Sequence, residues 1–102
     1  MVQINWTQMA VADLKSIYDF ISKGSKKYAQ LEIIKIKTRT RILKTKPLIG
    51  KEVVEKGNFA VRELLEGNYR IIYKIIDKER IDILSIHHSA RDLERRELIE
   101  SR

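Results

Sequence analysis

The sequence contains no cysteine, and it has only one proline and four glycines among its 102 residues. Without thiols the chain has neither disulfide bonds nor thiolate chemistry, which fits a reducing compartment. No apolar run approaches the length of about 18 residues that a membrane helix needs. Polar residues also interrupt the hydrophobic ones at the start of the chain. We therefore expect a protein of the cytoplasm that does not enter a membrane.

The 43% of hydrophobic positions predicts one domain, residues 1–102, with a core of its own. The net charge of +7 is unevenly distributed along this domain. Residues 23–46 hold nine of the 21 lysines and arginines but only one of the 14 acidic residues, Glu32. A segment that carries the whole basic excess indicates an acidic partner or a nucleic acid, although a solvated helix face has the same composition.

The N-terminal third predicts a strand followed by a helix. Residues 2–6 alternate apolar and polar side chains, as a half-buried strand does. Apolar residues then recur every three or four positions from Gln8 to Ser22, which predicts a helix with Thr7 as its N-cap. Gly24 is expected to end this helix by adopting a left-handed conformation.

A second helix is predicted from about Lys26 to Thr45, with Ser25 as its cap and Pro47 beyond its end. It carries two nearly opposite apolar stripes. The first stripe is Ala29, Ile33, Ile36, Thr40 and Leu43, and the second is Leu31, Ile34, Thr38 and Ile42. One stripe is expected to face the core, and the other is a candidate surface for a protein partner unless the fold absorbs both. Residues 47–57 predict a loop in which Gly50 is a flexible point.

Three antiparallel strands are predicted between residues 59 and 91, separated by a loop at Gly67 and a polar turn at residues 77–80. Pairing Ile76 with Ile81 predicts three further cross-strand pairs: Arg70 with His87, Ile72 with Ser85, and Lys74 with Ile83. One face then gathers Arg70, Lys74, Ser85 and His87 and is expected to look outward. The opposite face is expected to be buried; it carries Tyr69, Ile71, Tyr73, Ile75, Leu84, Ile86 and His88.

These elements predict an α+β fold in which a helical hairpin packs on one face of a small, mostly antiparallel sheet. The order is strand, helix, helix and three strands, followed by a C-terminal tail that begins with a capping box at Ser89. Trp6 and Tyr73 are expected to be core aromatics rather than platforms for stacking bases.

Seven segments, in this order and spacing, resemble the RelE/ParE superfamily of type II toxins over residues 4–93. They are Ile4-Asn5-Trp6-Thr7, Ala12-Asp13-Leu14, Ile17-Tyr18-Asp19-Phe20-Ile21, Pro47-Leu48-Ile49-Gly50, Val61-Arg62-Glu63-Leu64, Asn68-Tyr69-Arg70-Ile71-Ile72-Tyr73 and Ile86-His87-His88-Ser89-Ala90-Arg91. The resemblance implies a toxin that needs no cofactor and that an acidic antitoxin neutralises. The expected assembly is a homodimer or a toxin–antitoxin heterotetramer. It also implies one of two targets, because ParE-like members inhibit DNA gyrase and RelE-like members cleave messenger RNA on the ribosome.

The resemblance to the RelE-like branch is incomplete. Arg70 matches that branch's strand arginine, and Arg62 stands near one of its lysines, but Ala60 occupies the expected place of the second lysine and no tyrosine follows Arg91. His87 supplies an acid or base, so Arg62, Arg70 and His87 are the candidate catalytic residues of a nuclease. The two histidines alone are too few for a metal site.

We therefore expect a ParE-like gyrase inhibitor first, a ribosome-dependent endoribonuclease second, and a member that only binds its antitoxin third. Enzymatic activity is left open. The candidate residues for binding the target or the antitoxin are Leu31, Ile34, Lys35, Arg41, Ile42 and Arg91. Two structural alternatives remain: Arg70 pairs with Asp82 or Glu63, and a two-residue turn puts Glu63 in place of Arg62 on the Arg70 face.

Overall fold

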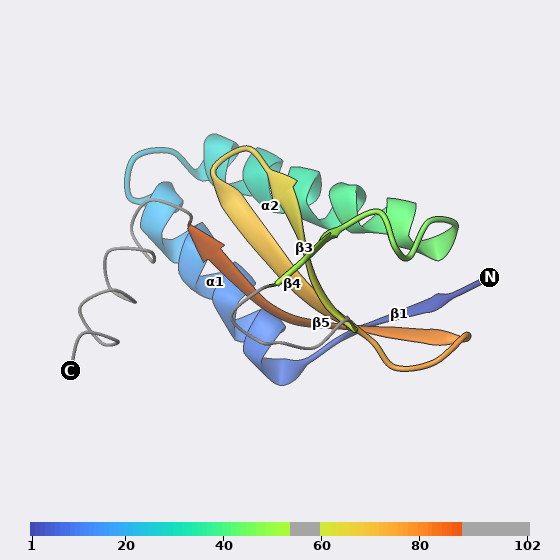
Figure 1. Ribbon diagram of the computed structural model, residues 1–102. Coiled ribbons are helices and arrows are strands. Elements are labelled where there is room, and N and C mark those ends of the chain that lie inside the picture. The colour runs from blue at the N-terminus through green and yellow to red at the C-terminus, as the bar shows by residue number, and fades with distance from the viewer. Residues whose placement is uncertain (54–59, 89–102) are drawn as a thin grey trace.

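The computed structural model describes residues 1–53 and 60–88, and it confirms the α+β architecture. Two antiparallel helices, α1 (Gln8–Ser22) and α2 (Lys26–Thr40), lie side by side against the sheet (Figure 1). Within the described residues the sheet has five strands: β1 (Gln3–Trp6), β2 (Lys51–Glu52), β3 (Val61–Glu66), β4 (Tyr69–Ile75) and β5 (Arg80–His88). None of the helices in the described part of the chain combines the length and apolarity needed to cross a bilayer.

Both helices begin at the predicted caps. The Thr7 hydroxyl accepts a hydrogen bond from Ala10 N at 3.2 Å, and the Ser25 hydroxyl accepts one from Tyr28 N at 3.2 Å. The ends differ from the predictions. Gly24 does not adopt a left-handed conformation, because the chain leaves α1 through right-handed helical geometry at Lys23. The second helix tightens at Arg41 into a short 3₁₀ helix, η1 (Arg41–Lys44), before the turn at Pro47.

The strands lie in the order β1-β5-β4-β3-β2. All neighbouring pairs are antiparallel except β1 and β5, which are parallel. Strand β2 falls in the segment predicted to be a loop, since two residues are too few for a periodic pattern to indicate a strand. The capping box at Ser89 and the C-terminal tail lie outside the described residues.

The predicted register of β4 and β5 is correct at one end and wrong at the other. Arg70 pairs with His87 and Ile72 with Ser85, as predicted, but Lys74 pairs with Asp82 instead of Ile83. A β-bulge at Leu84 causes the shift, because an extra residue on one strand exchanges the faces of all residues beyond it. Ile81 and Ile83 therefore point into the main core, and Leu84 packs on the opposite face against Ile72.

The first turns of α1 satisfy the backbone around this bulge. The Thr7 hydroxyl donates to the carbonyl oxygens of Ile83 at 2.8 Å and Leu84 at 3.1 Å. The Asp13 carboxylate accepts a hydrogen bond from Ile86 N at 2.8 Å. Because buried backbone groups must be paired, these contacts from Thr7 and Asp13 stabilise β5 at and beyond the bulge.

Replacing Asp13 with alanine is expected to lower the free energy of unfolding by about 1–3 kcal/mol, because the half-buried N–H of Ile86 loses its acceptor. Urea denaturation of purified protein measures the change. The matched control is Asp19→Ala on the same helix, where the side chain is exposed and the expected change is within about 0.5 kcal/mol. Equal effects of the two substitutions would show that Asp13 does not hold the bulge.

Two apolar clusters lie on opposite faces of the sheet. The main core joins α1, α2 and η1 to the helix-facing side of the strands; its buried residues include Leu14, Ile36, Leu43, Ile71 and Tyr73. A smaller cluster on the other face consists of Val53, Val61 and Ile72 with Leu84 packed against them. Tyr69 and Tyr73 are buried in the main core, as predicted, so the side chain of Arg70 projects away from the helices.

Candidate functional site

The hairpin between β3 and β4 separates two of the three candidate catalytic residues. Glu66 pairs with Tyr69, so the turn has only two central residues, and Gly67 has the positive φ of +57° that such a turn requires. This register places Glu63 on the Arg70 face and Arg62 on the helix-facing side. Arg62 and Arg70 therefore do not form one cationic group.

Arg70 is held in an ion pair by Glu63. The Arg70 Nε and Nη2 atoms lie 2.6 and 2.5 Å from Glu63 Oε2, and the two side chains are only 11% and 17% exposed. A charge-assisted pair with so little solvent access is stronger than a surface salt bridge. The structure therefore adopts one of the structural alternatives, in which the charge of Arg70 is neutralised within the fold.

His87 lies directly opposite Arg70 on the neighbouring strand, as the predicted register requires. Its Nε2 atom is 3.0 Å from the Ser85 hydroxyl, and the ring is half-buried. A second ion pair lies on the same face, where Arg80 donates to Asp82 at 2.8 and 3.0 Å. The hydrogen bonds from Arg80 lower the pKa of Asp82; burial opposes them with a smaller effect, and one hydrogen bond from Asn5 lowers the pKa further.

Tyr73 and Arg62 together hold the Pro47–Gly50 segment against the sheet. The Tyr73 hydroxyl donates to the Pro47 carbonyl at 2.7 Å and accepts from Gly50 N at 2.9 Å. Burial raises the pKa of Tyr73, despite the opposing hydrogen bond from Gly50, so the hydroxyl keeps the proton that it donates. Arg62 Nη1 donates to the carbonyls of Gly50 at 2.8 Å and Leu48 at 3.4 Å. Gly50 is thus a buried, closely packed position and not the flexible point that was predicted there.

Helix α2 exposes part of its second apolar stripe. Leu31 and Ile34 are 44% and 58% exposed, and Lys35 beside them is exposed as well. Ile42 was predicted to belong to this surface, but it is half-buried and packs against the core, because the chain tightens into η1. Arg91 lies outside the described residues.

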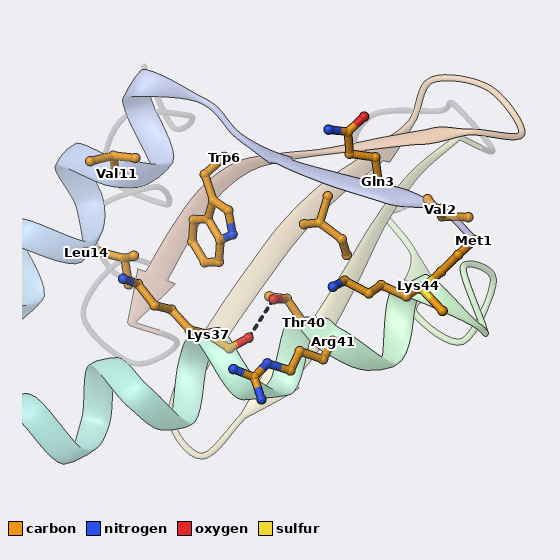
Figure 2. Close-up of a pocket in the computed structure, with 11 residues that line it drawn as sticks. Met1, Val2, Gln3, Trp6, Val11, Leu14, Lys37, Thr40, Arg41 and Lys44 are labelled. Carbon is orange, nitrogen blue, oxygen red and sulfur yellow. Dashed lines mark hydrogen bonds between the residues drawn. The ribbon is translucent and has the colours of Figure 1, made fainter.

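A groove of about 670 Å³ opens between β1, the start of α1 and the C-terminal half of α2 (Figure 2). Its lining residues are Met1, Val2, Gln3, Ile4, Trp6, Val11, Leu14, Lys37, Thr40, Arg41 and Lys44. Of these lining residues, only Arg41 is among the binding residues predicted from the sequence. The other residues come from three separate segments, so no local pattern indicates that they share one surface.

The family model described as the ParE toxin of the type II toxin–antitoxin system, parDE, matches residues 4–93. The chain belongs to this family of ParE toxins. This ParE-family toxin is also 34% identical to a protein named Toxin RelE2 from Caulobacter vibrioides over 95 residues, which cover 89% of this chain and 99% of the relative. Both comparisons confirm the predicted membership in the RelE/ParE superfamily.

A solved structure supports the same assignment. The structure described as the chromosomal ParDE TA system from P. aeruginosa matches this ParE-family toxin with a TM-score of 0.69 and 26% identity. The match covers 86% of this chain and 96% of the other. The fold and the family are therefore those of a type II toxin, and membership in a toxin–antitoxin system implies that an antitoxin is its partner.

Proposed function

We propose that this toxin acts in the cytoplasm by binding DNA gyrase and inhibiting it, and that it does not cleave RNA. The observation that carries the proposal is the separation of Arg62 from Arg70 by the sheet, together with the ion pair between Arg70 and Glu63. Its family description as a ParE toxin is consistent with this choice.

Cleavage of RNA by its 2′-hydroxyl requires a base, a proton donor and cationic groups around one phosphate. Arg62 is turned toward the Pro47–Gly50 segment, where it donates to two backbone carbonyls. Arg70 already neutralises a carboxylate, so a phosphate on this face would meet a negative charge beside the positive one. This arrangement supports a binding protein better than a phosphodiesterase.

The surface that we propose for the gyrase contact is the exposed face of α2 formed by Leu31, Ile34 and Lys35. Leu31 and Ile34 are neighbours at helical spacing, and both side chains are about half exposed. An exposed aliphatic pair flanked by charge is typical of an interface, where a few anchoring side chains supply most of the binding free energy.

The double substitution Leu31→Asp/Ile34→Asp is expected to raise the toxin concentration needed for half-inhibition of gyrase by at least about tenfold. The measurement is a supercoiling assay with purified gyrase and purified toxin. Met9→Asp is the matched control, because Met9 is an apolar side chain that is also exposed, on α1, and its substitution is expected to leave inhibition unchanged. If the parent protein does not inhibit gyrase under conditions in which a known inhibitor does, the proposed target is wrong.

The second candidate function is a ribosome-dependent endoribonuclease, which the placement of Arg70 opposite His87 favours. The similarity to a protein named Toxin RelE2 supports the same alternative. Primer extension on translated messages after induction separates the two functions: codon-linked cuts indicate the nuclease, and intact messages with an induced DNA-damage response indicate the gyrase inhibitor. A protein that does not slow growth when induced corresponds to the third prediction, a member that only binds its antitoxin.

A further inference from the structure

The C-terminal half of α2, together with η1 and the residues just after it, carries a dense group of cations. Five of the ten residues from 37 to 46 are lysine or arginine, and none is acidic. These side chains form the terminal patch: Lys37, Arg39, Arg41, Lys44 and Lys46. All of them are exposed except Arg39, which is half-buried. More than half of the nine basic residues of the segment 23–46 therefore lie at one end of α2.

The charges of the terminal patch are not neutralised within the described residues. Neither of the two ion pairs found there involves the patch. Arg39 Nε donates to the Leu65 carbonyl at 3.0 Å, and a neutral acceptor leaves the charge of the guanidinium unbalanced. Basic side chains near the C-terminus of a helix do complement its dipole, but the dipole amounts to only about half of one negative charge. Helix stability alone therefore does not account for five cations.

The patch occupies both flanks of the helix. Lys37, Arg41 and Lys44 border the groove beside β1 (Figure 2). Arg39 lies on the other flank, where it reaches the hairpin between β3 and β4. Lys37 and Arg39 point about 200° apart, since successive helical residues are separated by about 100°. Thr38 is exposed between them, so the helix presents cations on each side of a polar middle.

We propose that the terminal patch binds the phosphate backbone of double-stranded DNA without preference for sequence. An α-helix with its side chains is about 10–12 Å across, and the major groove of B-DNA is about 12 Å wide. A phosphate strand runs along each edge of that groove, so cations on the two flanks of α2 each face one strand. Lysine and arginine contacts to phosphate carry no sequence information.

Other nucleic acids fit the patch less well. The major groove of double-stranded RNA is too deep and narrow to admit a helix. Single strands are held by stacking their bases on aromatic side chains, and residues 37–46 include no aromatic residue. Charge complementarity and the width of the helix therefore favour a DNA duplex.

Fluorescence anisotropy of a labelled DNA duplex, titrated with the purified toxin, tests the proposal. The dissociation constant is expected to be about 1–100 μM at physiological salt, in the range of binding without sequence specificity. The logarithm of the association constant is expected to fall with the logarithm of the salt concentration with a slope of about −4, since each phosphate contact contributes about −0.9.

Lys37→Gln/Arg41→Gln is expected to weaken binding by at least about tenfold and to reduce the steepness of the salt slope by about 2. Lys44→Gln alone is expected to reduce it by about 1. The matched control, Lys26→Gln/Lys27→Gln, removes the same number of exposed charges from the opposite end of α2. These lysines lie about 15 Å or more from the patch, beyond the Debye length of about 8 Å, so the affinity is expected to change by less than about threefold.

Urea denaturation confirms that the variants are as stable as the parent. Equal losses of affinity in the patch variant and the control overturn the proposal, because they show that net charge alone is responsible. Absence of binding by the parent at low salt also overturns it. Equal affinity for double-stranded RNA, for single-stranded DNA or for a polyglutamate peptide excludes a surface specific for duplex DNA.

The inference goes beyond gyrase inhibition and does not depend on it. The terminal patch begins after Leu31, Ile34 and Lys35, the surface proposed for the gyrase contact, and the DNA titration contains no gyrase. A toxin that binds DNA through the patch but does not inhibit gyrase contradicts the proposed function alone. A toxin that inhibits gyrase but does not bind DNA contradicts this inference alone.

Discussion

Gly50→Ala is expected to lower the free energy of unfolding by about 3 kcal/mol, because overpacking and a broken hydrogen bond act at the same position. A Cβ atom on Gly50 would collide with the Tyr73 hydroxyl, and it would lie 2.6 Å from a ring carbon of Tyr73 and 2.7 Å from the Glu63 carbonyl oxygen. None of these neighbours is a flexible end. Tyr73 is fully buried and hydrogen-bonded to Pro47, and the Glu63 carbonyl belongs to strand β3.

The measurement is urea denaturation of the purified variant. Gly24→Ala is the matched control, because a Cβ there meets only the Ile21 carbonyl at 3.7 Å, and its expected effect is within about 1 kcal/mol in either direction. Tyr73→Phe is expected to cost about 1–3 kcal/mol, since it removes both hydrogen bonds of the hydroxyl without adding volume. If Gly50→Ala is as stable as the parent, the Pro47–Gly50 segment moves more freely than this packing allows.

Local signals in the sequence were sufficient for the helices and for the existence of the last three strands. Thr7 and Ser25 cap the helices through hydrogen bonds to residues only three positions away, so the local sequence predicts both caps directly. The two stripes were separated correctly within α2, since Ile36 is buried and Ile34 is exposed, but not at Ile42, which lies in η1 and packs against the core.

The features that the sequence did not predict depend on contacts between distant segments. The bulge at Leu84 is stabilised by Thr7 and Asp13, which lie more than 70 residues earlier in the chain. Gly50 is packed because Tyr73, a residue of β4, reaches across the sheet to it. The separation of Arg62 from Arg70 was left open for a different reason: a loop longer by one residue exchanges the two faces of β3, and composition alone does not determine that length.

The ion pair between Glu63 and Arg70 is expected to show strong coupling in a double-mutant cycle. Either Glu63→Met or Arg70→Met alone leaves one largely buried charge without its partner and is expected to cost about 3 kcal/mol of unfolding free energy. The double variant Glu63→Met/Arg70→Met removes both charges and keeps a similar volume, so it is expected to lie within about 1 kcal/mol of the parent. Urea denaturation of the four proteins gives the coupling free energy, and additive effects would contradict a strong pair.

The same double variant separates a structural role of Arg70 from a catalytic one. If Arg70 only neutralises Glu63, the double variant is folded and inhibits gyrase with about the potency of the parent, whereas the single variants lose activity in proportion to their loss of stability. If Arg70 instead holds a phosphate beside His87, the double variant is folded but inactive, because the position opposite His87 then carries no cation. A folded double variant that no longer inhibits gyrase therefore contradicts the binding mechanism proposed here. A folded double variant that still inhibits gyrase contradicts the nuclease mechanism, because that mechanism depends on Arg70 of β4.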